Sequence, residues 1–384
     1  MKIIADKNIH FVDQAFKQFG DVLLIPTTDF KNEVVRDADI IVVRSEVKVN
    51  EKLLDGSNVK FVGTSTIGTD HIDLNYLNQK NIGFANAPGS NSNSVAEYVV
   101  AVLLEIQEKF NLELKGKSLG VVGVGNCGSK VVKYAKALGM NVIQNDPPLK
   151  RLTGNSEFVP LDDLMECDII SLHVPLTYEG EDKTHHLFAR ERIFKMKKGS
   201  ILINTSRGAV VETTALKDAL DSGHLLTAVI DVWENEPNID SELLEKVFIG
   251  TPHIAGYSLD GKVNAIKMVY EAACKYFNQP IQWDPSNELQ KITWLGRLKT
   301  EVVVDNKTSL NQIIKNNYDI LEDHEKMTVL YKLPKSQQGV YFMGLRTSYP
   351  IRREFFNTKI HIHKERSNLK NILEALNFKV VILD

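Results

Sequence analysis

Residues 118–146 read SLGVVGVGNCGSKVVKYAKALGMNVIQND, and the fold of the chain is decided here. The apolar start predicts a buried strand, the sequence GVGNCG at 123–128 predicts a tight turn, and the apolar residues that recur at helical spacing up to Leu138 predict a helix. Gly139 ends this helix, and residues 141–144 predict a second strand that leads to Asp146. The order strand, glycine turn, helix, strand and acid is typical of a dinucleotide-binding unit.

Each glycine of the turn has a physical role in that interpretation. Gly123 permits the tight turn, Gly125 lets the backbone approach a pyrophosphate, and Gly128 lets the helix pack close to the strand. The free N–H groups at the start of the helix would face the anion. Asp146 would accept hydrogen bonds from ribose hydroxyls and repel a 2′-phosphate, so the sequence predicts NAD rather than NADP. The alternative, a glycine-rich turn without a ligand, explains neither the strand, the helix nor the acid.

Composition excludes several classes of protein. A chain of 384 residues predicts two or three domains, and 43% hydrophobic with 25% charged residues is ordinary for a globular protein. A net charge of −3 gives no general attraction to nucleic acid or to an anionic membrane. We find no signal peptide and no segment apolar enough for a membrane span, and the three scattered cysteines form neither a disulfide framework nor a zinc motif. We therefore expect a cytoplasmic protein with no metal, no nucleic acid and no membrane among its partners.

Strand and helix signals alternate over residues 1–92, which predicts a second parallel sheet with covering helices. Ligands of such sheets lie at the carboxyl ends of the strands. Arg44, Ser45 and Thr66 fall at two of these ends and are candidate substrate residues. The alternative for Ser45 and Thr66 is a purely local role as caps of helices or turns.

Three charged or titratable residues follow successive strands of the dinucleotide-binding region: Arg207, Glu236 and His253. Oxidation of a 2-hydroxy acid needs a cation for the carboxylate and a base for the hydroxyl proton as hydride leaves. Arg207 suits the first role and His253 the second, while Glu236 would orient the imidazole. Glu234 is the rival carboxylate, and we prefer Glu236 because Pro237 fixes the backbone directly after it.

The segments VVGVGNCG, NDPP, INTSRGAVV, DVWENEP and TPHIAGYS resemble the D-2-hydroxyacid dehydrogenases. The resemblance implies the Arg, Glu and His set above as catalytic residues. It further implies NAD contacts at Asn126, Cys127, Asp146, Val174, Asp231 and Gly256, and substrate contacts at Ser45, Thr66 and Tyr257.

The fuller set VRSEVKVNE, GTSTIGTDHID and APGSNSNSVAEYV, with a C-terminal extension, resembles the branch of that family that acts on a phosphorylated acid, 4-phospho-D-erythronate. This implies NAD-dependent oxidation to 3-hydroxy-2-oxo-4-phosphobutanoate in pyridoxal 5′-phosphate synthesis. The alternatives are another member such as a phosphoglycerate dehydrogenase, or a non-catalytic NAD-sensing corepressor.

The resemblance also implies the domain organisation: a flavodoxin-like substrate domain at 1–93 and 258–285, an inserted Rossmann domain at 94–257, and a small α+β domain at 286–384 that forms a homodimer. In the last of these we expect a long helix over 310–330, strands at 300–304, 340–345, 359–363 and 379–383, and a ferredoxin-like order. His361 and His363 share one strand face, which without a third ligand favours a polar surface over a metal site. Arg346, Arg352 and Arg353 fall in a loop-like stretch, either a solvated basic loop or a source of an arginine for the active site of a dimer partner.

Overall fold

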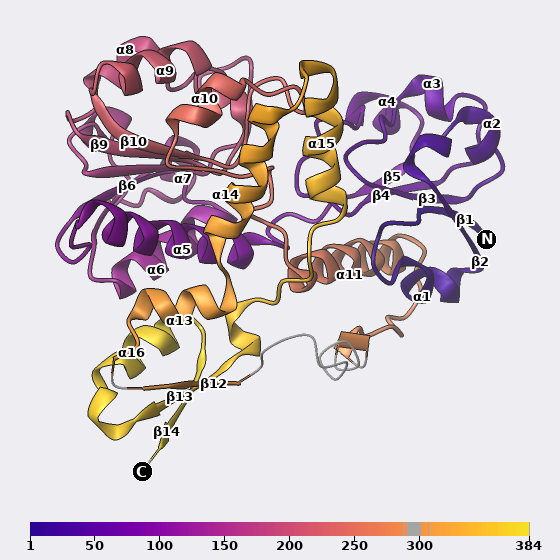
Figure 1. The fold of residues 1–384 in the computed structure, drawn as a ribbon. Coiled ribbons are helices and arrows are strands. Elements are labelled where there is room, and N and C mark those ends of the chain that lie inside the picture. The colour runs from indigo at the N-terminus through magenta and orange to yellow at the C-terminus, as the bar shows by residue number, and fades with distance from the viewer. Residues whose placement is uncertain (287, 290–300, 306, 384) are drawn as a thin grey trace. The chain divides into compact units, whose positions relative to one another are not determined.

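The computed structural model describes residues 1–383 apart from 287, 290–300 and 306, so the expected strand start at Thr300 lies outside the described residues. The chain divides into two compact units, one of residues 1–91 and 258–298 and the other of residues 92–257 and 299–384. Each unit is built on a parallel sheet with helices, and Figure 1 shows the elements of both. The predicted α/β fold class is confirmed.

The first unit has a five-stranded sheet in the order β2-β1-β3-β4-β5, and all neighbouring strands are parallel. This is the flavodoxin-like order. The strands are β1 (Lys2–Asp6), β2 (Asp21–Ile25), β3 (Ile40–Val43), β4 (Phe61–Thr64) and β5 (Gly83–Ala85). The covering helices are α1 (Val12–Phe16), α2 (Asn32–Val35), α3 (Glu51–Leu54), α4 (Leu74–Gln79) and α11 (Leu259–Tyr276).

Strand β3 shows why this sheet is apolar on both faces. Ile40 and Val42 belong to the core under α1 and α11, whereas Ile41 and Val43 belong to the core under α2, α3 and α4. Successive side chains of a strand point to opposite faces, so a strand covered on both sides must be apolar at every position. The unbroken apolar run IIVV therefore reflects a sheet that is covered by helices on both faces.

The second unit has a six-stranded parallel sheet in the order β11-β10-β9-β8-β6-β7. The chain passes from β6 to β7 on one side and returns to β8 on the other, so the order reverses beside β6, where dinucleotides bind in Rossmann folds. The strands are β6 (Ser118–Val122), β7 (Asn141–Asn145), β8 (Ile169–Leu172), β9 (Ser200–Asn204), β10 (Leu225–Ile230) and β11 (Ile249–Gly250). The helices are α5 (Ser92–Phe110), α6 (Asn126–Ala137), α7 (Pro147–Thr153), α8 (Arg190–Lys195), α9 (Thr213–Asp221) and α10 (Ser241–Lys246).

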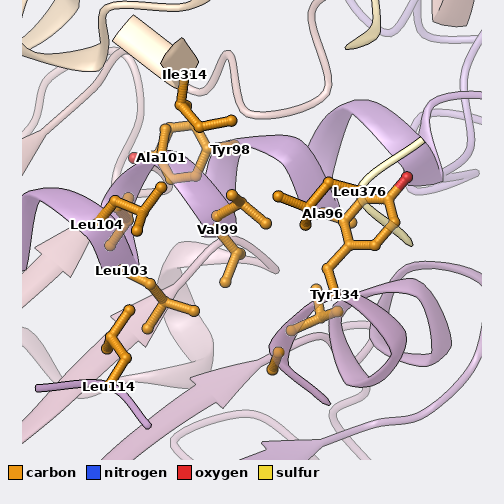
Figure 2. Packing of buried hydrophobic residues seen from close by; sticks show 14 of the residues in the cluster. Ala96, Tyr98, Val99, Ala101, Leu103, Leu104, Leu114, Tyr134, Ile314 and Leu376 are labelled. Carbon is orange, nitrogen blue, oxygen red and sulfur yellow. The ribbon is translucent and has the colours of Figure 1, made fainter. Parts of the chain in front are cut away.

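Helix α5 is the centre of the larger core of this unit. Figure 2 shows its Val99, Leu103 and Leu104 among other buried apolar side chains, with Tyr134 of α6 and Ile314 of the C-terminal part in the same cluster. The helix begins at Ser92. Ser94 lies inside the first turns, and its hydroxyl donates to Glu354 (Oγ to Oε1 2.6 Å). Among the described residues, no helix combines the length and the apolar character needed to cross a membrane.

The C-terminal segment, which we define as the described residues 301–383, packs on the Rossmann part of the same unit: α13 contacts α5, α16 contacts α6, and α14 contacts β11. Its three strands are parallel and ordered β12-β13-β14. They are β12 (Glu301–Val304), β13 (Lys359–His363) and β14 (Lys379–Leu383). The helices are α13 (Leu310–Asn317), α14 (Ile320–Thr328), α15 (Lys335–Thr347) and α16 (Asn368–Ala375).

Two expectations for this segment were wrong. Residues 340–345 are part of helix α15, not a strand, because Gly339 and Phe342 bury one side of a helix in the second core of the unit. The expected long helix over 310–330 is two helices. The first ends before Tyr318, whose backbone is extended, and Asp319 caps the second (Leu321 N to Oδ1 3.1 Å). With that strand lost and the remaining three parallel, the order is not ferredoxin-like.

Asp168, just before β8, ties three parts of the second unit together. It accepts bonds from the backbone N–H and the hydroxyl of Ser118 (both 3.0 Å) and from Lys197 Nζ (2.8 Å). Partial burial raises the pKa of Asp168, but the bonds from Lys197 and Ser118 outweigh it and lower the pKa to about 2.

We therefore expect Asp168→Asn to lower the free energy of unfolding at pH 7 by about 2 kcal/mol. Because the folded pKa is depressed, this contribution is present above pH 3.8 and is lost as the pH falls toward 2. Denaturant unfolding of both proteins between pH 7 and pH 3 measures it, with the exposed Asp162→Asn as control. Equal stability of Asp168→Asn and wild type at pH 7 would remove Asp168 from this role.

Candidate active site

The glycine turn after β6 has the geometry of a ligand cradle. Gly123 has φ +83°, and a Cβ there would meet the carbonyl oxygen of His173 at 2.7 Å. A Cβ at Gly128 would overlap the carbonyl of Gly123, so helix α6 can start this close to the strand only with glycine. At Gly125 a Cβ would meet nothing within 4 Å, which leaves open space beside the backbone. These features fit the pyrophosphate of a dinucleotide at the start of α6, where Asn126 and Cys127 lie.

Cys127 is a thiol rather than a thiolate. Burial raises its pKa to about 11, an effect that the charges of Lys130 and Arg207 only partly offset.

Asp146, the first residue after β7, is held by two backbone donors. Its Oδ2 accepts from Val124 N in the glycine turn (2.8 Å), and its Oδ1 accepts from Leu149 N as the cap of α7 (2.9 Å). Each carboxylate oxygen can accept more than one bond. The carboxylate is therefore fixed beside the cradle and can still receive ribose hydroxyls.

Asp146→Asn is expected to narrow the preference for NAD over NADP by about 10-fold or more, because it removes the charge that repels a 2′-phosphate and weakens the ribose bonds. Asparagine still caps a helix well, so the fold should be unaffected. The ratio of kcat/KM for the two cofactors measures the effect, and Asp163→Asn on the surface is the control. An unchanged ratio would place Asp146 away from the ribose.

Arg207, Glu236 and His253 follow three neighbouring strands, β9, β10 and β11, at the same edge of the sheet. Glu236 and His253 are in direct contact: Glu236 Oε2 lies 2.8 Å from His253 Nδ1. Glu236 Oε1 also accepts from Trp233 N (2.8 Å). Because Nδ1 faces the carboxylate, Nε2 is the imidazole nitrogen left for a substrate.

Glu236 is ionised in this arrangement. Burial on its own raises the pKa of Glu236, but the adjacent His253, the Trp233 N–H and the charge of Arg346 bring it below its ordinary value. A carboxylate on Nδ1 stabilises an imidazolium, so the pair can take up a proton at Nε2. A base held in this way is what alcohol oxidation requires.

Asp231, predicted to contact NAD, organises the His253 loop. Its buried carboxylate accepts from Thr251 Oγ1 (2.6 Å), Ile254 N (2.7 Å) and Ala255 N (3.0 Å). Its carbonyl oxygen accepts from His253 N (2.7 Å), and His253 has φ +57°, a backbone conformation that non-glycine residues rarely adopt. The sequence does not reveal this role; contact of Asp231 with NAD stays a prediction.

Neighbouring candidates for the base are engaged elsewhere. Glu234 Oε1 lies 2.8 Å from His186 Nε2, and its Oε2 accepts from Thr213 N (2.9 Å), so it does not contact His253. Burial lowers the pKa of His173, at the end of β8 beside Val174, to about 3. His173 is therefore neutral near pH 7 and a weak base.

Tyr257, four residues after His253, is contacted by arginines of the C-terminal segment. Arg346 Nη2 donates to its hydroxyl (3.1 Å), and Arg352 Nε donates to its carbonyl oxygen (3.1 Å). The loop-like stretch expected here is corrected: Arg346 lies in α15, and Arg352 is buried rather than solvated. Both contacts join residues about 90 positions apart, so the sequence alone does not reveal them.

The first unit contains Arg44, Ser45 and Thr66. Arg44 Nη2 pairs with Glu46 Oε1 (2.9 Å), and Ser45 Oγ lies 3.4 Å from the other oxygen of Glu46. Thr66 Oγ1 donates to Gly68 O (2.9 Å), a local turn bond. The Thr66 bond is the local turn bond that the alternative expects, whereas the Ser45 contact is with a side chain and is no cap. The substrate role of both residues stays a prediction.

A further cation accompanies Arg44. Burial and the charge of Arg44 lower the pKa of Lys262, on α11, to about 8, and the same two cations, together with burial, lower the pKa of His10. Positive charges close enough to lower the pKa of Lys262 and His10 favour a bound anion.

Known dehydrogenases are similar to this chain both in sequence and in structure. Residues 104–255 match the family model "D-isomer specific 2-hydroxyacid dehydrogenase, NAD binding domain". Erythronate-4-phosphate dehydrogenase of Chromohalobacter salexigens is 39% identical over 99% of this chain and 99% of its own length, and that of Bacteroides fragilis is 43% identical over 92% of this chain and 97% of its own. A D-lactate dehydrogenase from Aquifex aeolicus, solved with NAD and lactic acid, aligns at a TM-score of 0.59 and 28% identity, over 77% of this chain and 98% of its own.

Proposed function

The chain belongs to the erythronate-4-phosphate dehydrogenase family of D-isomer specific 2-hydroxyacid dehydrogenases, and from this we propose that it oxidises C2 of 4-phospho-D-erythronate to give 3-hydroxy-2-oxo-4-phosphobutanoate. It is an NAD-dependent oxidoreductase that acts on a CH–OH group. The reaction is a step in the synthesis of pyridoxal 5′-phosphate. The main support for this proposal is the hydrogen bond between Glu236 and His253. These two residues follow β10 and β11, which neighbour β9, the strand that Arg207 follows.

Each residue of this set has one task. Arg207 binds the carboxylate of the acid with its planar fork of donors and polarises the C2 oxygen. His253 Nε2 takes the hydroxyl proton, and Glu236 holds the ring and stabilises the imidazolium. Bound NAD supplies the acceptor for the hydride that leaves C2.

Cofactor binding is assigned to the second unit. Gly123, Gly125 and Gly128 shape the cradle, and Asp146 receives the ribose hydroxyls. Asn126 and Cys127 lie at the helix start, and Val174, Asp231 and Gly256 complete the proposed set. For the first unit we propose that Ser45, Thr66 and Arg44 contact the substrate, with Lys262 adding charge beside Arg44.

We also propose a homodimer formed through the C-terminal segment. In support, Val303, His361 and Val381 lie in register across the outer face of its sheet, with 68% of Val303 and 37% of Val381 exposed. Exposed branched apolar side chains on a sheet favour burial against another surface. Light scattering should give twice the chain mass, and the monomer mass would contradict the dimer. For location we propose the cytoplasm, where the three free cysteines would stay reduced.

The test of the proposed activity is NADH formation, followed at 340 nm, with 4-phospho-D-erythronate, D-erythronate, D-3-phosphoglycerate and D-lactate. The proposal expects the highest kcat/KM with the first compound and a product with the mass of the 2-oxo acid. A higher kcat/KM with phosphoglycerate would instead indicate the phosphoglycerate dehydrogenase alternative. Binding of NAD without oxidation of any of the acids would favour a sensor.

A further inference from the structure

Arg346 of the C-terminal segment contacts Tyr257, four residues after His253 of the catalytic pair. It belongs to the last turn of α15, and its Nη2 donates to the Tyr257 hydroxyl (3.1 Å) while its guanidinium lies 5.8 Å from the centre of the Tyr257 ring. Its charge also acts on Glu236, whose pKa it helps to lower. A residue 93 positions beyond His253 in the sequence thus adds positive charge to the site.

The neighbouring arginines have other tasks. Arg352 is 6% exposed; it donates to the carbonyl oxygens of Ser94 (3.2 Å), Ala255 (3.1 Å) and Tyr257 (3.1 Å), and it stacks 4.1 Å from the centre of the Tyr318 ring. Arg353 donates to Asn357 Oδ1 (2.6 Å). Arg352 therefore fixes the backbone of the loop that contains Tyr257, whereas the bond from Arg353 goes to a residue of the C-terminal segment.

This arrangement is preorganised. The loop from His253 to Tyr257 is held on one side by Asp231 and on the other by Arg352, so the backbone that carries Tyr257 has little freedom to lose when a ligand binds. Charged donors that are fixed in advance bind anions more tightly than flexible ones.

We propose that Arg346, together with the Tyr257 hydroxyl, binds the phosphate of the substrate and so selects a phosphorylated acid. The inference rests on the proposed function, which places the substrate carboxylate at Arg207 and C2 at His253. The phosphate of a four-carbon acid is then a few bonds from C2, and Arg346 is held by Tyr257, four residues after His253. Arg346 presents several N–H donors as well as charge, which suits a phosphate dianion.

The experiment compares Arg346→Met, Arg346→Lys and the control Arg353→Met on 4-phospho-D-erythronate and D-erythronate. Arg346→Met is expected to lower kcat/KM for the phosphorylated acid by about 30-fold or more, mainly through KM, and for D-erythronate by less than about 3-fold. Arg346→Lys should regain part of the loss because it restores the charge without the planar fork. Arg353→Met should match wild type on both acids.

Equal losses on both acids would overturn the inference and leave Arg346 as a support for Tyr257, and so would no loss on either. If the wild type does not oxidise 4-phospho-D-erythronate, the proposed function fails, and the same comparison is then made with 3-phosphoglycerate and glycerate. A second readout does not need activity: inorganic phosphate, against KCl of equal ionic strength, should raise Tm of the wild type and of Arg353→Met but not of Arg346→Met. No shift in the wild type, or an equal shift in Arg346→Met, contradicts the proposal.

Discussion

Replacing His253 with glutamine is expected to lower kcat by a factor of about 10² to 10⁴ while KM for the hydroxy acid changes little. Glutamine is a polar side chain of similar size to histidine, but it cannot take up the hydroxyl proton. The loss should therefore appear in the chemical step, because the carboxylate contact at Arg207 remains. Steady-state kinetics of NADH formation at saturating NAD measure it.

The structure offers a matched control in His186. This histidine also pairs with a glutamate at 2.8 Å, Glu234, whose second oxygen bonds to Thr213 rather than to the catalytic pair. His186→Gln should keep kcat near the wild-type value. Comparable losses in the two variants, or near-normal turnover of His253→Gln, would refute the assignment of His253 as the base.

Arg207→Lys is expected to lower kcat/KM by about 10²-fold or more, with both kcat and KM affected. The lysine keeps the charge but loses the planar pair of donors that fits a carboxylate, and a bond to a charged group contributes about 1.5–3 kcal/mol. Kinetics with varied hydroxy acid at saturating NAD measure both parameters. Arg190→Lys, at an exposed arginine that pairs with Asp218, is the control for a general effect of the exchange. A wild-type KM in Arg207→Lys would show that the carboxylate is bound elsewhere.

Local signals were enough to predict the framework of this protein. The glycine turn, the acid after β7 and the apolar strands each depend on a short stretch of sequence, and parallel strands place their carboxyl ends at one edge. That rule predicts that Arg207, Glu236 and His253 lie at one edge of the sheet, where they are found, and Glu236 rather than Glu234 contacts His253.

What the sequence did not predict depends on distant partners. Arg346 is 89 residues from Tyr257, and nothing near either residue signals their contact. The stretch VYFMGL at 340–345 has the branched and aromatic residues of a strand, but burial of Phe342 in the core of the Rossmann part selects a helix. The donors that meet Asp231 come from residues 251–255, after the next strand, so its role in holding the His253 loop cannot be recognised in the sequence.

We propose that hydride passes from C2 to NAD while His253 takes the hydroxyl proton. The most direct test follows deuterium from 4-phospho-D-erythronate labelled at C2. Mass spectrometry of both products after a single turnover gives its destination. We expect one deuterium in the reduced cofactor and none in the 2-oxo acid. Deuterium released to water, or kept in the organic product, would contradict it.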